Sequence, residues 1–332
     1  MRVLFLQHFS RQCGVKAHGN RFVQAMVDHS PKEDMWIAAN ISTMDHIRAA
    51  VNYWKPDITL INYHPSAIGG FEPELNFNLK TTVVCLPHEE LNLEGAMNFR
   101  NRHPCFSAAL WQDPTLGGMA DYANYKIYVI PRLIPRFLRT RVKQRRGIPV
   151  DHTLIKVFGF GFGDKQPELM VKFIEESFDK ATIECHFSKN EIADPDGRNG
   201  EIMVERLRAA VTKPGIQVIT SIAMFHESYM TDNQLIEWSS DGDVNLCLHG
   251  VGTGIASTTD IMMAARVPFA INDSPFFRHL PKDIVLGPGN TMRDILNKGI
   301  GSWEKLVEET WSPKAFADGV RSALTLIKSR VR

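Results

Sequence analysis

Short apolar runs alternate with helical patterns along this chain, and this alternation is the feature that most constrains its fold. In the first 130 residues, strands buried on both faces are expected at 3–9, 58–61, 82–86 and 127–130. Helices are expected at 17–28, where Phe22 and Met26 recur at helical spacing, and at 45–53. Because strands joined through helices run parallel in one sheet, the alternation predicts an α/β protein built on parallel sheets.

A proline-rich and basic segment interrupts the alternation at 131–149, and it carries seven Lys or Arg residues and no acid. After it the pattern restarts with a strand at 154–158, a glycine turn and a helix at 167–178. Further strands are expected at 182–187, 216–220, 244–248, 268–271 and 284–286. The sequence predicts Rossmann-like domains at 1–135 and 151–311, a basic linker at 136–150, and a C-terminal helix at 312–332 that packs back on the first domain.

The composition excludes several classes of protein. Lys and Arg number 38 against 37 Asp and Glu, and this net charge of +1 predicts no global attraction to nucleic acid or to anionic membrane. The five cysteines include no C-x-x-C pair, which is typical of reduced core residues. No apolar run is long enough to span a membrane, so we expect a cytoplasmic protein, or one of the host cytoplasm if the chain comes from a bacteriophage.

The segment 249–272 reads as a glycine turn, a helix and a buried strand in immediate succession. Gly250, Gly252 and Gly254 are expected to take positive φ and to let the backbone approach a ligand, while the hydroxyls of 257–259 cap the helix. The first amides of such a helix form a site for a phosphate. The alternative is a loop that needs glycine only to turn.

Several motifs together resemble the GT-B glycosyltransferases, in particular glycosyltransferase family 4. MRVLFLQHFSRQCGV is similar to the family's first strand and glycine loop, and VVCLPHEE to the strand that ends in a catalytic-site histidine. FGFGFGDK and GTGIASTTDIMMAARVPFAI resemble the two segments that form the sugar-nucleotide site. The resemblance implies a GT-B fold with two Rossmann-like domains facing a central cleft. It also implies a transferase, retaining if it follows family 4, that uses a nucleotide-sugar co-substrate without a tightly bound cofactor or a required divalent metal.

The resemblance also implies which residues form the site. Donor contacts are expected from Gly14, Lys165, Gly254, Ile255, Ala256, Ser257, Thr258 and Asp260, and catalytic roles from His88 and Glu89. The chain departs from the family at Phe160, where the family has a phosphate-binding arginine, and Asp260 stands one residue from the family's acid. Open alternatives are a solvated surface lysine at Lys165 and a loop histidine without a role at His88.

Two D-x-D sequences, at 194–196 and 241–243, could bind a divalent ion, but their composition favours turns. The glycines of FGFGFGDK, with Glu184 at the end of the next strand, imitate a dinucleotide fingerprint that lacks its third glycine. The sequence therefore disfavours a metal site and a dehydrogenase.

The basic segment gives candidate acceptor-binding residues, namely Arg132, Arg136, Arg139 and Arg141. It is either a solvated linker face or a surface for an anionic acceptor. The acceptor stays open among a glycan, a small molecule and DNA. Alternative functions are a bacteriophage-type DNA glycosyltransferase acting on hydroxymethylated pyrimidines, a non-catalytic nucleotide-sugar-binding protein and a sugar-nucleotide epimerase.

Overall fold

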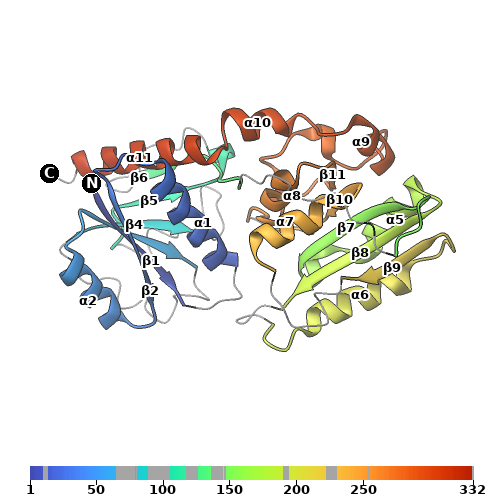
Figure 1. Ribbon diagram of the computed structural model, residues 1–332, viewed down its shortest axis with the longest axis horizontal. Helices are drawn as coiled ribbons and strands as arrows, with labels where there is room; N and C mark the ends of the chain where they lie inside the picture. Colours follow the sequence, from blue (N-terminus) through green and yellow to red (C-terminus); the bar gives the residue numbers. More distant parts are fainter. Residues whose placement is uncertain are drawn as a thin grey trace. The chain divides into compact units, whose positions relative to one another are not determined.

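The computed structural model describes residues 1–9, 14–64, 79, 81–88, 105–116, 126–135, 145, 147–189, 194–221, 230–252 and 254–330. The chain forms two compact units (Figure 1). Unit 1 combines Met1–Leu133 with Glu309–Arg332, and unit 2 is Ile134–Glu308. The C-terminal segment thus belongs to the same unit as the N-terminus.

Unit 1 is a parallel sheet with helices on both faces. Its strands, in the order β2-β1-β3-β4-β5-β6 across the sheet, are β1 (Arg2–His8), β2 (Met35–Ile41), β3 (Ile58–Tyr63), β4 (Thr82–Pro87), β5 (Ala108–Trp111) and β6 (Lys126–Val129). Its helices are α1 (Gly14–His29), α2 (Met44–Trp54) and α11 (Pro313–Arg330), with a short 3-10 turn η2 (Pro114–Leu116).

Alternation along β1 explains how unit 1 divides its core between two faces. Val3 and Phe5 point to the face that α1 and α11 cover, whereas Leu4 and Leu6 point to the face under α2. The aromatic ring of Phe22 on α1 meets that of Phe316 on α11 edge to face, 5.1 Å between centroids. Because Phe316 is buried in this core, α11 stabilises the N-terminal sheet, and Figure 1 shows it beside α1.

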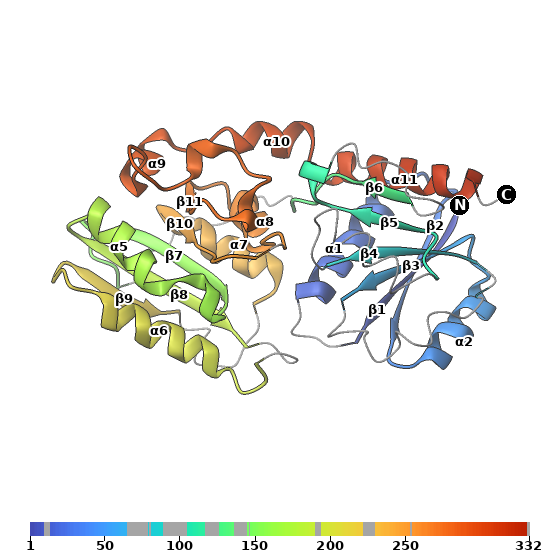
Figure 2. The same ribbon diagram turned by 180° about the vertical axis from the view of Figure 1, so that it is seen from behind.

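Unit 2 is a second parallel sheet, seen from behind in Figure 2. Its strands, in the order β11-β10-β7-β8-β9, are β7 (Thr153–Phe160), β8 (Ala181–Ser188), β9 (Ile216–Thr220), β10 (Val244–Cys247) and β11 (Phe269–Ile271). Its helices are α5 (Pro167–Ser177), α6 (Arg198–Ala210), α7 (Asp232–Ser240), α8 (Thr258–Ala265), α9 (Met292–Lys298) and α10 (Trp303–Glu309). Short 3-10 turns are η3 (Gly163–Lys165), η5 (Pro275–Phe277) and η6 (Lys282–Ile284).

The strand orders fix where each unit offers a binding site. In unit 1 the order reverses between β1 and β3, and in unit 2 between β7 and β10. Open parallel sheets bind ligands at the carboxyl ends of the strands where the order reverses. The segments that follow β1, β3, β7 and β10 are therefore the first places to look for chemistry.

The predicted α/β class with two parallel sheets is confirmed, but three predicted details differ from the structure. The strands β2 and β5 were not predicted. The strand expected at 284–286 is wrong, because this segment contains the end of η6 and pairs with β11 only through a single bridge between Ile271 and Val285.

Candidate functional site

The carboxyl end of β7 brings three candidate donor-site segments together. Gly159 has φ of 118°, a conformation that side-chain-bearing residues rarely adopt. A β-carbon at Gly159 would lie 3.3 Å from Thr258 Oγ1 and 3.4 Å from Lys165 Nζ. The backbone of β7 therefore passes directly beside the lysine of η3 and the first residue of α8. A side chain at Gly159 would crowd both groups and strain the strand.

Lys165 is buried, with 3% of its surface exposed, so the alternative of a solvated surface lysine is wrong. Its Nζ lies 3.4 Å from His249 Nε2, its one hydrogen-bond partner among the described residues. Burying an ammonium group costs free energy unless acceptors or negative charge surround it. The ammonium group of Lys165 can therefore donate further hydrogen bonds to an anionic ligand.

His249 and Asp164 form a pair beside this lysine. His249 Nδ1 lies 2.8 Å from Asp164 Oδ2, and the Gly250 amide donates to the Asp164 carbonyl at 2.7 Å. Burial alone would lower the pKa of His249, but its hydrogen bonds to Asp164 and Cys247 outweigh burial and raise that pKa. The hydrogen bond from His249 in turn lowers the pKa of Asp164. The pair holds the imidazole with Nε2 directed toward Lys165.

The glycines after β10 act differently from the prediction. None of Gly250, Gly252 and Gly254 adopts the left-handed conformation. Instead, a β-carbon at Gly252 would lie 2.3 Å from Phe276 Cε2, and one at Gly254 would lie 3.2 Å from Phe276 Cε1. The Phe276 ring also packs on His249, with 4.6 Å between ring centroids. These two glycines give Phe276 the space to contact and orient the His249 ring.

The N-terminus of α8 lacks the predicted side-chain cap. Ser257 is exposed and makes no side-chain cap hydrogen bond, and the Thr259 hydroxyl donates to the Ala256 carbonyl at 2.7 Å instead. The Ala256 amide, a predicted donor contact, donates to the Phe276 carbonyl at 3.3 Å. Among the described residues, no hydrogen bond engages the amides of Ser257 and Thr258. These two amides are the ones that α8 can offer to an anion.

The remaining donor candidates lie on different elements. Gly254 and Ile255 precede α8 and are half-buried, whereas Asp260 is buried in the first turn of α8. Gly14 is the first residue of α1 in unit 1, at the carboxyl end of β1. The structure thus groups Lys165 and Thr258 closely, places 254–257 on the segment that leads into α8, and leaves Gly14 at the corresponding edge of the other sheet.

His88 follows β4 at the carboxyl edge of unit 1. Its amide donates to the Tyr63 carbonyl at 3.0 Å, and its Nε2 lies 2.5 Å from Asn62 Oδ1. Burial first, and then the charges of His64, Arg21 and His8, lower the pKa of His88 from its ordinary 6.5 to about 3. With its pKa this low, the ring of His88 is neutral near pH 7. Glu89, its predicted catalytic neighbour, lies outside the described residues.

We expect this neutral histidine to make the fold sensitive to acid. The pKa of His88 in the folded chain lies below its ordinary value, so the unfolded chain binds more protons once the pH falls below about 6.5. The free energy of unfolding should then fall with decreasing pH by up to about 1.4 kcal/mol per pH unit for this residue. Urea unfolding at pH 7 and pH 5 measures the fall, and His88→Gln should make it shallower. An equal fall in both proteins would contradict this assignment.

The candidate acceptor residues divide between described and undescribed positions. Arg132 is buried in unit 1 and its guanidinium donates to the Gln112 carbonyl at 3.4 Å, while Arg136, Arg139 and Arg141 lie outside the described residues. Arg145, from the same basic segment, binds Asp243 through Nη1 at 3.0 Å and also bonds the His152 carbonyl. Arg145 therefore has a structural role in unit 2 instead of facing an acceptor.

Three acids of the alternative motifs, Asp194, Asp243 and Glu184, have structural partners. Asp194 accepts a hydrogen bond from the Asn199 amide at the start of α6, and Asp243 accepts one from the Leu154 amide at 2.8 Å. Glu184 lies in the middle of β8, not at the predicted strand end, and bonds the ammonium of Lys156 and the indole of Trp238. A dinucleotide ribose would find this carboxylate already occupied, which disfavours a dehydrogenase.

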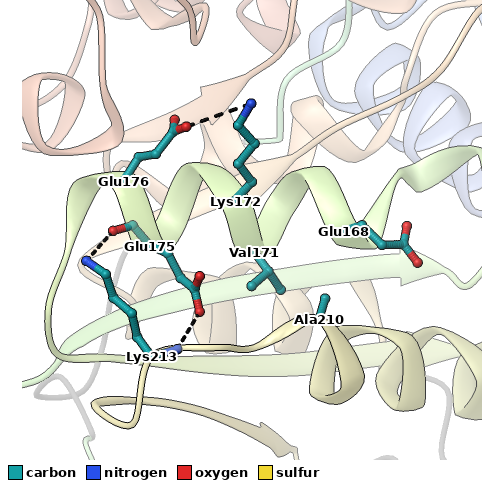
Figure 3. A pocket seen from close by; sticks show the side chains of 7 residues that line it. All are labelled: Glu168, Val171, Lys172, Glu175, Glu176, Ala210 and Lys213. Carbon is teal, nitrogen blue, oxygen red and sulfur yellow. Dashed lines mark hydrogen bonds and ion pairs between the residues drawn. The ribbon is translucent and has the colours of Figure 1, made fainter.

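A shallow hollow of about 490 Å³ lies between α5 and the end of α6 (Figure 3). Its charged side chains pair with one another or with neighbours: Glu175 accepts from the Thr212 and Lys213 amides, and Glu168 binds Arg206 at 2.8 Å. The hollow presents no candidate donor or catalytic residue. We therefore assign it to packing between the two helices.

No helix in the described part of the chain is long and apolar enough to cross a membrane. The His, Cys, Asp and Glu side chains of the same part do not gather in groups of three or more that could hold a metal ion.

Three residues of this site were not predicted from the sequence: Gly159, Asp164 and His249. The available signal was position, because Gly159 and His249 lie at or just after the carboxyl ends of β7 and β10. Asp164 directly precedes the predicted Lys165. Their association depends on the fold, since Asp164 and His249 are separated by 85 residues.

Comparison with known proteins gives structural relatives only. The chain matches no protein-family model and no curated protein. HepE of Anabaena, solved in complex with UDP-glucose, is 11% identical, with a TM-score of 0.59 over 100% of this chain and 98% of that one. The lipopolysaccharide outer core galactosyltransferase WaaB is 11% identical, with a TM-score of 0.58 over 98% of this chain and 99% of that one. A glycosyltransferase of Rickettsia africae is 10% identical, with a TM-score of 0.62 over 100% and 98%.

These likenesses extend over both units and nearly the whole length of each relative. At this level of identity they establish architecture and leave activity to be argued from the site. With two parallel sheets in the order found here, the chain has the GT-B fold.

Proposed function

We propose that this protein is a nucleotide-sugar-dependent glycosyltransferase that moves a sugar from a nucleotide donor to a hydroxyl acceptor. The observation that carries the proposal is the buried Lys165, held by His249 beside Gly159 and the start of α8 at the reversal point of unit 2. A lysine, two helix-start amides and a close backbone approach are the groups that bind a diphosphate.

The chemistry of sugar transfer explains why a diphosphate needs such a site. As the bond to the sugar breaks, negative charge develops on the leaving diphosphate, and groups already aimed at that charge stabilise the transition state. Lys165 is fixed in place before the ligand arrives, because it is buried and contacts His249. HepE, which shares this fold, was solved with UDP-glucose, and this supports a UDP-sugar as the first donor to test.

The other candidate residues take roles that fit their chemistry. His88 is neutral at physiological pH and would contact a hydroxyl of the transferred sugar at the edge of unit 1. The first turn of α1, which begins at Gly14, would offer its amides to the donor. We infer retention of configuration from the resemblance to family 4. The acceptor stays open among a glycan, a small molecule and DNA. Enzymatic release of the sugar to water or an acceptor would exclude a non-catalytic binding protein.

Replacing Lys165 with methionine should weaken binding of UDP-glucose by about 1 to 3 kcal/mol, because a charge-assisted hydrogen bond to phosphate is lost. Methionine fills a similar volume, so the variant should stay folded. Isothermal titration calorimetry measures both affinities. The matched control is Lys172→Met on the exposed face of α5, which should bind like the wild type. Equal affinity in the Lys165 variant would remove this residue from the site.

A further inference from the structure

Asn62 connects two parts of unit 1 that the proposed function uses. It lies near the end of β3 and is fully buried, with 0% of its surface exposed. Its Nδ2 donates to the carbonyl of Val15 at 2.8 Å, in the first turn of α1. Its Oδ1 lies 2.5 Å from Nε2 of His88. One side-chain amide thus joins the start of α1 to the candidate catalytic histidine.

The carbonyl of Val15 determines which way the Asn62 amide points. A carbonyl oxygen accepts hydrogen bonds and cannot donate them, so the Asn62 atom that faces Val15 must be the NH₂ group. Oδ1 therefore faces His88, and because Oδ1 only accepts, His88 Nε2 must carry the proton. The ring is neutral near pH 7, so Nδ1 then holds a lone pair. The orientation of Asn62 follows from backbone chemistry and does not depend on the histidine itself.

Packing around Asn62 leaves it little room to turn over. A β-carbon at Gly19 of α1 would lie 2.5 Å from Asn62 Nδ2 and 2.2 Å from Gln7 Oε1. The absence of a side chain at Gly19 therefore lets α1 lie directly on the amide. The ring of His88 is itself in contact with the ring of His18, edge to face, with 4.8 Å between the ring centroids. Amide and imidazole are both held in place by neighbours.

We propose that Asn62 is a positioning residue that holds His88 in the Nε2–H tautomer, so that the ring presents the Nδ1 lone pair to a ligand hydroxyl. Nδ1 makes no hydrogen bond with the residues that the structure describes, and His88 is half-buried, not enclosed. A lone pair attracts a hydroxyl group and repels a phosphate oxygen. The ligand group at His88 is thus a sugar hydroxyl, which deepens the proposed function and rests on it.

The tautomer can be measured without turnover. In protein labelled with ¹⁵N-histidine, long-range ¹H–¹⁵N NMR distinguishes a protonated ring nitrogen from one with a lone pair, and the signals missing in His88→Gln identify residue 88. The wild type should show protonated Nε2 and unprotonated Nδ1 from pH 5 to pH 8. Asn62→Leu removes the acceptor and should give a mixture of tautomers. A wild-type ring protonated at Nδ1, or an unchanged tautomer in Asn62→Leu, would overturn the proposal.

A second variant keeps the test decisive if Asn62→Leu does not fold. Asn62→Asp preserves shape and the acceptor oxygen but adds a negative charge, so the pKa of His88 should rise by about one unit or more. Among the described residues, the other groups that face His88 are His8, His18, His64 and Arg21, all unchanged in this variant. The control is Asn20→Asp, which makes the same change on the exposed side of α1, where Asn20 accepts from Gln7. An unshifted His88 titration in Asn62→Asp would overturn the proposal.

Kinetics then separates the positioning role from a merely structural one. If the wild type transfers or hydrolyses a sugar, Asn62→Leu should lower kcat by roughly ten- to a hundredfold, the scale on which histidines lose function when their orienting partner is removed. Asn62→Asp, which keeps the tautomer, should recover part of that loss. If the wild type turns over no nucleotide sugar, the proposed function fails, while the NMR result still decides the tautomer.

Discussion

Replacing His88 with alanine is expected to lower kcat for release of glucose from UDP-glucose by two orders of magnitude or more, with the affinity for UDP-glucose nearly unchanged. In the proposed site the diphosphate, which supplies most of the binding charge, contacts unit 2, so removing a ring in unit 1 should leave that contact intact. The lost contact is one that strengthens as the sugar changes shape in the transition state. Such a loss appears in kcat, measured at saturating donor, and leaves the dissociation constant nearly constant.

The control for this experiment is His46→Ala, on the exposed face of α2, where the imidazole Nδ1 lies 3.1 Å from the Ser42 hydroxyl. It should turn over UDP-glucose like the wild type. Calorimetry on both variants gives the dissociation constants for the same comparison. If His88→Ala keeps its turnover, the chemistry lies elsewhere in the chain.

Replacing Glu184 with glutamine is expected to destabilise unit 2 by about 3 to 5 kcal/mol, the usual result of removing one partner from a buried ion pair. Lys156 is 2% exposed and its ammonium also lies 4.2 Å from the centre of the Trp238 ring. Without the carboxylate, this buried positive charge has lost the ion-pair partner that the structure gives it. Urea unfolding followed by circular dichroism measures the change in the free energy of unfolding.

A double variant distinguishes an orphaned charge from simple loss of packing. Lys156→Met combined with Glu184→Leu removes both charges and should recover most of the stability, because apolar side chains of similar volume often replace buried pairs without loss. The exposed pair of Lys172 and Glu176 on α5, 3.9 Å apart, supplies the control. There Glu176→Gln should change stability by at most about 1 kcal/mol. A double variant as unstable as Glu184→Gln would contradict the charge argument.

The sequence predicts most strands of both sheets, at the edges as well as in the centre, but misses β2 and β5. β1, β3 and β4 are buried on both faces, so they read as continuous apolar runs. β2 lies at the edge of its sheet and is half-exposed along most of its length, and β5 has only four residues. β5 is too short to stand out, whereas β2 is as long as β1 and largely apolar, so its run was simply not recognised. The wrong strand at 284–286 is apolar because Ile284 and Leu286 are buried, although they do not lie in a sheet.

For the site, the sequence indicates positions but not the reasons for them. His88 was predicted because it follows a buried strand, and Lys165 because the resemblance to family 4 implies a phosphate-binding lysine there. The glycines near α8 were predicted for positive φ, yet Gly252 and Gly254 are explained by the space that Phe276 occupies. The glycine of the site that does adopt a positive φ is Gly159, in a different segment. Side-chain packing between segments that are distant in the sequence determines the conformation and contacts of these glycines. Local sequence propensity does not predict that packing.

The most direct test of the account places a carboxylate where the diphosphate should meet α8. Ser257 is exposed and its hydroxyl caps no amide, so Ser257→Glu should fold normally. Calorimetric titration with UDP-glucose should then detect binding to the wild type but none to Ser257→Glu. The control is Thr325→Glu, which adds the same charge at an exposed position of α11 and should bind UDP-glucose like the wild type. Equal affinity of Ser257→Glu and wild type would contradict the central claim that the donor diphosphate binds at the start of α8 beside Lys165.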